Sequence, residues 1–60
     1  MRIVKFEDGS FGIRRGIFTY KYRDLRHPRY WWSVKSGFFV DCKGTYEMCQ
    51  KLMDKHEVLE

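Results

Sequence analysis

The apolar residues of this chain follow one period as far as Cys42 and another from Gly44 onward. Before Cys42, segments such as "IVKFEDGSFGIRR" and "IFTYKYRDL" alternate apolar and polar residues, which is typical of β-strands. After Gly44, one stripe at helical spacing consists of Tyr46, Cys49, Leu52, Met53 and His56. Strands followed by a single helix indicate a small α+β domain. We therefore predict one domain over 1–60, with an antiparallel β-meander of four to five strands over 2–42 and a C-terminal helix over 45–58 packed on one face.

Asp8-Gly9 separates the first two predicted strands and is favoured in two-residue turns. In that register Phe6 faces Phe11, and Val4 faces Ile13, on the apolar side of the ladder. The residues expected on the opposite side are Lys5, Gly12 and Arg14. The first hairpin thus predicts one apolar face and one cationic face.

The segment over 17–25 is predicted as a third strand, with Tyr20 and Tyr22 on the apolar face. Pro28 interrupts the ladder because proline has no N–H to donate. "YWWSVK" and "FFVDC" are then predicted to form a second hairpin around 36–37. Neighbouring residues of a strand face opposite ways. We therefore expect Trp32 beneath the helix and Trp31 exposed on the cationic face.

The length of 60 residues is near the lower limit for independent folding, so the apolar core is thin. Self-association would bury additional surface, and we expect a homo-oligomer or a firm partner. No apolar run approaches the ~20 residues of a membrane span, and the N-terminus has no signal-peptide core. We expect a cytoplasmic protein with no membrane partner, in which Cys42 and Cys49 are free thiols.

The net charge of +4 is unevenly distributed, with +6 over residues 1–43 and −2 over residues 44–60. Such a field attracts nucleic acid, nucleotides, anionic membrane or an acidic protein surface. Arginine binds phosphate bidentately, and an aromatic ring can stack on a base. The candidate binding residues are Arg14, Lys21, Arg23, Arg26, His27, Arg29 and Trp31. The alternative is that these cations only keep an exposed strand face from aggregating.

No catalytic motif is present, and a sheet this small offers little depth for an oriented general base. We therefore predict that the protein is not an enzyme and needs no cofactor. Cys42, Cys49 and His56 recur every seven residues, but a structural zinc site usually has four ligands. A fourth ligand would have to be Asp41 or His27, and on this incomplete set of ligands we predict no metal site.

The segments "KFEDGSFGIRRG", "YWWS" and "DCKGTYEMCQKLM" resemble small uncharacterised accessory proteins of tailed bacteriophages. The resemblance covers most of the chain but carries no functional motif. It implies an accessory protein that inhibits a host defence system in the host cytoplasm. The clustered cations and aromatic rings, in a chain too small for an enzyme, favour sequestration of an anionic ligand such as a signalling nucleotide or a short oligonucleotide. Two alternatives stay open: an inhibitor that binds and blocks a host protein, and a general module for single-stranded nucleic acid.

Overall fold

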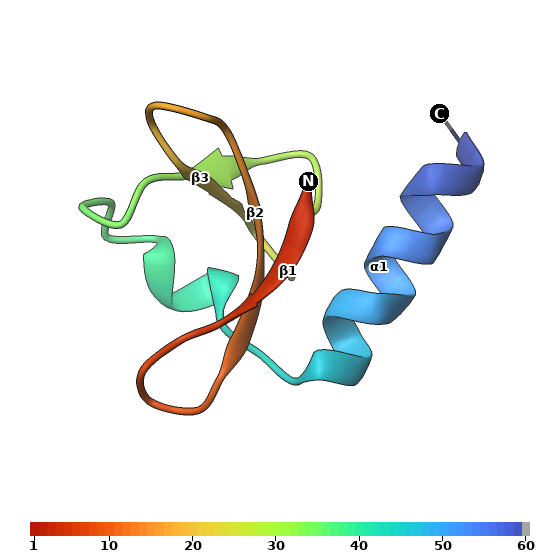
Figure 1. Ribbon diagram of the computed structural model, residues 1–60, viewed down its shortest axis with the longest axis horizontal. Coiled ribbons are helices and arrows are strands. Elements are labelled where there is room, and N and C mark those ends of the chain that lie inside the picture. The colour runs from red at the N-terminus through yellow and green to blue at the C-terminus, as the bar shows by residue number, and fades with distance from the viewer. Residues whose placement is uncertain (60) are drawn as a thin grey trace.

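A computed structural model describes the backbone of residues 1–59 and the side chains of residues 1–54. An antiparallel sheet contains, in order, β1 (Arg2–Lys5), β2 (Phe11–Arg15), β3 (Lys21–Arg23) and β4 (Trp31–Trp32). The 3-10 helix η1 (Phe39–Cys42) and the α-helix α1 (Tyr46–Leu59) lie on opposite sides of this sheet (Figure 1). We call these the η1 side and the α1 side. The predicted α+β fold, a small antiparallel sheet with one C-terminal helix, is confirmed.

The register of the first hairpin differs from the prediction by one residue. Ile3 pairs with Ile13, and Val4 pairs with Gly12. The loop has three residues (7–9) rather than two. Within it the N–H of Gly9 donates to the carbonyl of Phe6 (3.0 Å), and Gly9 has a φ of 91°. A turn followed by a left-handed glycine is the usual three-residue hairpin loop. Because strand residues alternate between faces, this single extra residue separates Val4 from Ile13.

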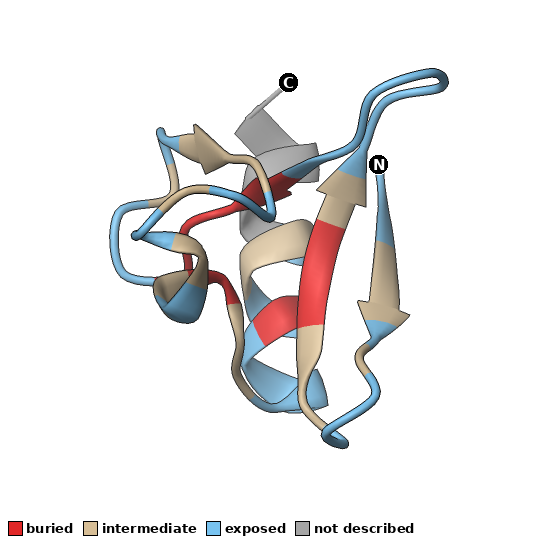
Figure 2. Ribbon diagram, turned by 90° about the vertical axis from the view of Figure 1, so that its left-hand side faces the viewer, coloured by how far each residue is buried: buried red, intermediate tan, exposed pale blue. Residues whose placement is uncertain are grey.

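The principal core lies between the sheet and α1. Ile13 of β2 and Cys49 of α1 are completely buried, and Leu25 is buried beside them. The partly buried side chains packed against this cluster are Ile3, Phe11, Trp31, Leu52 and Met53. Figure 2 shows the buried segments in the middle of β2, in and just after β3, and on α1 where it meets the sheet.

A second, aromatic cluster fills the η1 side. Phe39 of η1 contacts the edges of Tyr22 and Phe6, with ring centroids 5.2 and 5.4 Å away. Gly12 lies beneath these rings. A larger residue would not fit there, because a Cβ at this position would come within 2.7 Å of the Phe6 ring and 2.8 Å of the Cys42 carbonyl oxygen. The sheet is therefore covered on both sides, which explains how so short a chain uses so many aromatic residues.

The predicted second hairpin around residues 36–37 is wrong. After β4 the chain makes successive turns, with hydrogen bonds from Ser36 N–H to the Ser33 carbonyl (3.0 Å) and from Phe39 N–H to the Ser36 carbonyl (3.1 Å). It then forms η1 where a strand was expected. Contacts of Phe39 with the sheet outweigh the local alternation, because they bury an aromatic ring.

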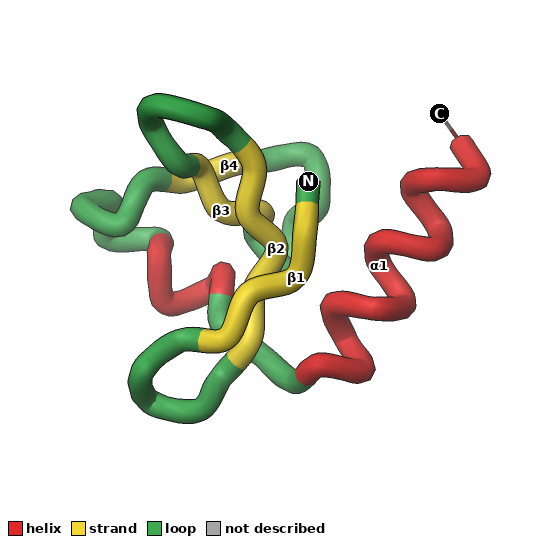
Figure 3. The backbone as a smooth tube through the Cα atoms, viewed as in Figure 1, coloured by secondary structure: helices red, strands yellow, loops and turns green. Residues whose placement is uncertain are grey.

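The predicted third strand is also shorter than expected. Only Lys21–Arg23 pairs with its neighbours, and residues 16–20 form the loop between β2 and β3. Ile17 and Phe18 are 82% and 95% exposed in this loop. We call residues 16–20 the hairpin tip, and Figure 3 shows it standing away from α1.

Helix α1 begins after Thr45, whose side-chain oxygen accepts a hydrogen bond from the Met48 N–H (3.1 Å). The predicted apolar stripe is confirmed for Cys49, Leu52 and Met53. Tyr46 is more exposed but contacts the ring of Phe11 edge-on at 5.5 Å. The side chain of His56 lies outside the described residues. Neither helix in the described part of the chain is long and apolar enough to cross a membrane.

Candidate functional site

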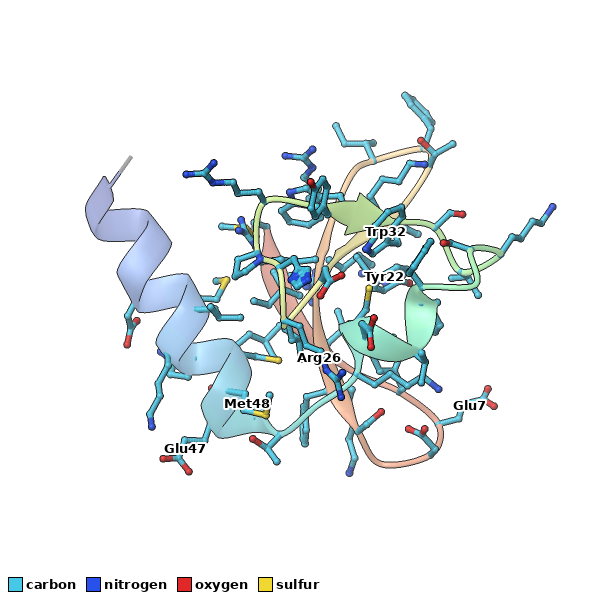
Figure 4. All side chains as sticks on the ribbon, turned by 180° about the vertical axis from the view of Figure 1, so that it is seen from behind. Glu7, Tyr22, Arg26, Trp32, Glu47 and Met48 are labelled. Atoms are coloured by element: carbon cyan, nitrogen blue, oxygen red, sulfur yellow. The ribbon has the colours of Figure 1, made fainter. Side chains whose placement is uncertain are left out.

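One row of side chains crosses all four strands on the η1 side. The register places Arg2 opposite Arg14, Arg14 opposite Tyr22, and Tyr22 opposite Trp32. Figure 4 shows Tyr22 and Trp32 near one another within this row. Two cations therefore occupy one end of a continuous row, and two aromatic rings occupy the other.

Arg2 and Arg14 form a like-charged pair. Directly opposite like charges on one sheet face destabilise the pairing. The guanidinium carbon of Arg14 lies 4.1 Å from the centre of the Tyr20 ring, which holds the group flat. A stacked guanidinium keeps its N–H edge available for hydrogen bonds to a phosphate. This pair can therefore bind an anion, and binding would relieve its repulsion.

At the other end of the row, three rings form a stack. Trp32 lies between Tyr30 and Phe38, with ring centroids 5.8 and 4.7 Å away and interplanar angles of 30° and 27°. Tyr30 is 56% exposed and Phe38 is 55% exposed, so the outer rings of the stack are open to solvent. Exposed ring faces of this kind accept nucleobases of any sequence.

Asp24, which is almost fully buried, holds the stack in place. Its Oδ2 accepts a hydrogen bond from the Trp32 indole (3.0 Å), and its Oδ1 accepts the backbone N–H groups of Arg26 (2.8 Å) and His27 (2.9 Å). Burial alone would raise the pKa of this carboxyl. The hydrogen bonds from His27 and Trp32, followed by that from Arg26, outweigh burial and keep the pKa below its usual value of 3.8.

The predicted position of Trp31 is wrong, because it lies on the α1 side and packs against the core. Its ring is flanked by the guanidinium groups of Arg15 and Arg23, at 4.1 and 4.5 Å. Arg23 is buried and donates to the carbonyl of Pro28 (2.6 Å). With guanidinium groups already on its ring, Trp31 is a structural residue rather than an exposed stacking surface.

The structure divides the predicted binding residues between different surfaces. Lys21, Arg23 and Trp31 share the α1 side, whereas Arg14 lies on the η1 side. Three further candidates, all exposed, lie in the loop between β3 and β4: Arg26, His27 and Arg29. The Arg26 side chain is 79% exposed, and its Nε is 3.8 Å from Asp41. The predicted single cationic face is therefore wrong, because the register of β2 with β3 pairs Arg14 with Tyr22 and Arg15 with Lys21, which puts Arg14 and Lys21 on opposite faces.

Several site residues were missed by the sequence patterns: Arg2, Tyr20, Asp24, Tyr30, Trp32 and Phe38. Arg2 follows from strand alternation once the three-residue loop is recognised, and Tyr20 follows once Arg14 is paired with Tyr22. The stack could not be found in this way, because Phe38 reaches Trp32 through the turns after β4. Asp24 precedes "LRHP", and an aspartate before a turn is a local signal that was available.

Cys42 and Cys49 are buried free thiols, as predicted. Burial, and then the nearby Asp24 and Asp41 carboxylates, raise the pKa of Cys42 to about 11. Burial also raises the pKa of Cys49. No group of three His, Cys, Asp or Glu side chains suited to a metal, and no enclosed pocket, occurs within the described residues.

The chain matches no family model, and no curated protein or solved structure is significantly similar to it. The resemblance to phage accessory proteins accordingly stays a prediction.

Proposed function

We propose that the protein is a non-enzymatic binding protein that sequesters a nucleotide-class anion, a signalling nucleotide or a short oligonucleotide, on the η1 side of its sheet. The observation that carries this proposal is the shared row of Arg2, Arg14 and Trp32. Phosphate and base are the two chemical parts of a nucleotide, and this row presents a partner for each.

The phosphate would bind between Arg2 and Arg14. Their opposed positions allow both guanidinium groups to donate to one phosphate. The stacking of Arg14 on Tyr20 reduces the entropy lost when it binds. Neutralising the pair would also remove the repulsion between its members.

The base would stack on the ring of Phe38 or of Tyr30, the two exposed rings that stack on Trp32. Two strand spacings, about 10 Å, separate Arg14 from Trp32. Phosphate and base would therefore lie at the two ends of the row, on either side of the buried Tyr22. The hydrogen bond from Trp32 to Asp24 fixes the middle ring, and the outer rings stack on it. The stack is thus ordered before a ligand arrives, which lowers the entropic cost of binding.

Inhibition of a host defence is the biological role that the phage resemblance adds to this proposal. The protein would act by lowering the free concentration of the nucleotide, without chemical change. Co-expression with a nucleotide-dependent defence system tests this role through the recovery of phage plaques. Recovery that persists in a variant unable to bind nucleotide would instead favour direct inhibition of a host protein.

The binding test is a titration of fluorescein-labelled oligothymidylates of increasing length, together with a thermal-shift series of mononucleotides and cyclic dinucleotides. We expect Phe38→Ala and Arg14→Gln each to weaken binding about tenfold or more, given about 1–3 kcal/mol for a stacked base. For oligonucleotides, the logarithm of the affinity should fall with the logarithm of salt concentration, with a slope of about −0.7 per contacted phosphate.

Matched controls separate the site from general electrostatics. Lys51→Gln removes one charge from α1, and Val40→Ala removes an exposed apolar side chain from η1. Both should leave the affinity within twofold of the unsubstituted protein. Equal losses in Arg14→Gln and Lys51→Gln, or no stabilisation by any of these ligands, would contradict the proposal.

A further inference from the structure

The hairpin tip (residues 16–20) exposes two large apolar side chains that the aromatic site does not use. Phe18 is 95% exposed and Ile17 is 82% exposed, at adjacent positions of the turn. Figure 2 shows the tip as a narrow projection beyond the body of the protein. Leaving these two side chains in water forgoes the favourable free energy of burying their apolar surface, which a chain with so small a core can ill spare. Their exposure therefore indicates that the tip contacts an apolar surface outside the chain.

Cations surround the base of this projection. Arg15 and Lys21 form the last pair of the ladder before the tip, and both are exposed. Arg14 precedes them on the other side of the sheet. From Arg14 to Arg23 the sequence contains no acidic residue. The tip is thus an apolar point with a positively charged collar.

We infer that the hairpin tip docks on an anionic membrane surface. Ile17 and Phe18 would enter the boundary between headgroups and acyl chains, which lies about 5–10 Å into the surface. Arg15 and Lys21 would remain at the level of the anionic headgroups. Such surface docking needs no membrane-spanning helix, and none occurs within the described residues.

Tyr20 adds a third feature that suits a bilayer. It is 46% exposed at the end of the tip, immediately before Lys21. Tyrosine favours the membrane–water boundary, because its ring is apolar and its hydroxyl is polar. The apolar Ile17 and Phe18 therefore occupy the turn, and the amphipathic Tyr20 and the charged Lys21 lie closer to the strands.

Charge argues against contact between the tips of two copies of the chain. Each copy carries a net charge of +4, and the tip itself has a cationic collar. Contact between two tips would bring the collars of both copies together, which is electrostatically unfavourable. An anionic lipid surface instead attracts the collar while it accepts the apolar residues.

Flotation with lipid vesicles tests the inference on the full chain. Vesicles of phosphatidylcholine alone are compared with vesicles that contain about one third phosphatidylglycerol. The anionic lipid gives the second set a negative surface potential, to which each nearby Lys or Arg adds binding affinity. We expect binding to the anionic vesicles and little to the neutral ones. Phe18→Ser should reduce the partition coefficient about tenfold or more. Arg15→Gln and Lys21→Gln should each reduce it about fivefold.

Insertion is distinguished from surface adsorption by a Phe18→Trp variant. Its added fluorescence should shift to the blue and be quenched by brominated lipids, whereas the unsubstituted protein should show little quenching. Val40→Ser, which changes an exposed apolar residue on η1, should leave the partition coefficient unchanged. Circular dichroism should show an intact fold in every tip variant, since Phe18 is almost fully exposed.

Three outcomes would overturn the inference: no binding to anionic vesicles, binding that Phe18→Ser leaves unchanged, or an oligomer that Phe18→Ser dissociates in the absence of vesicle binding. The last would assign the tip to a second copy. The proposed nucleotide site is tested independently, because Phe18→Ser should retain oligonucleotide affinity and Phe38→Ala should retain vesicle binding.

Discussion

The indole N–H of Trp32 donates a hydrogen bond to Oδ2 of Asp24 across 3.0 Å, and this bond joins β4 to the residue that follows β3. The N–H of Asp24 in turn donates to the carbonyl of Tyr30 (2.9 Å). The buried carboxylate thus fixes the ring of Trp32, and the backbone N–H of the same residue closes the loop over 24–30 at Tyr30. The stability of the protein and the shape of the proposed binding surface depend on the same group.

Trp32→Phe should lower the free energy of unfolding by about 1.5–3 kcal/mol, the usual range for a hydrogen bond to a charged group. The substitution keeps an aromatic ring in the stack but removes the donor to Asp24. Urea denaturation measures the change. In a double-mutant cycle with Asp24→Asn, the two losses should be smaller together than their sum. Full additivity would show that the hydrogen bond contributes nothing.

Acid should destabilise the protein through Asp24. Because folding lowers the pKa of this group, its contribution is present above the usual value of 3.8 and is lost as pH falls through the lower folded pKa. Asp8 acts in the same direction, because hydrogen bonds from Ser10 and Lys43 also lower its pKa. Thermal melts at decreasing pH should show a weaker acid dependence in Asp24→Asn, and an Asp8→Asn variant isolates the second group. An unchanged profile in Asp24→Asn would contradict the prediction.

Trp31→Ala should destabilise the fold by about 3 kcal/mol, because the ring packs against the core on the α1 side. The sequence pattern instead predicts Trp31 as an exposed residue, whose removal would leave the fold nearly intact. Tyr30→Ala is the matched aromatic control, and its exposed ring should cost less than about 1 kcal/mol. Guanidinium chloride denaturation of the two variants measures the difference. Equal losses would show that Trp31 is not part of the core.

Gly12→Ala should destabilise the protein by about 1–3 kcal/mol, the usual cost of overpacking. The new methyl group would come within 2.7 Å of the Phe6 ring and 2.8 Å of the Cys42 carbonyl oxygen. Gly37→Ala is the control, because nothing lies within 4 Å of a Cβ at that position, and its stability should change by less than about 0.5 kcal/mol. Differential scanning fluorimetry compares the two, and a stable Gly12→Ala variant would contradict the packing of the η1 side.

Neither cysteine should react readily in the folded protein. Cys42 and Cys49 are completely buried, and burial raises the pKa of each thiol, that of Cys42 to about 11. The thiolate is the reactive form, so little of it exists at neutral pH. Ellman's reagent should label both thiols only after denaturant is added. Rapid labelling of the native protein would contradict their burial.

Local patterns in the sequence located the first hairpin and the C-terminal helix. The Asp8-Gly9 signal located the first hairpin, and the helical stripe through Cys49, Leu52 and Met53 predicted the packed face of α1. These features depend on side chains a few residues apart, which a linear pattern records directly. The charge of the first two thirds of the chain was likewise available from residue types alone.

Which residues share a face was decided only by the tertiary structure. Gly9 adds one residue to the first hairpin loop, and this shift sets which residues of β1 share a face with those of β2. The register of β2, β3 and β4 pairs Arg14 with Tyr22 and Tyr22 with Trp32, so Trp31 lies on the other side of the sheet. The approach of Phe38 to Trp32, and of Phe39 to Tyr22, comes from turns that carry no alternation signal. The side-chain period of a strand is two, so one residue of register reverses every face, and only packing energy summed over the whole sheet selects between the two registers.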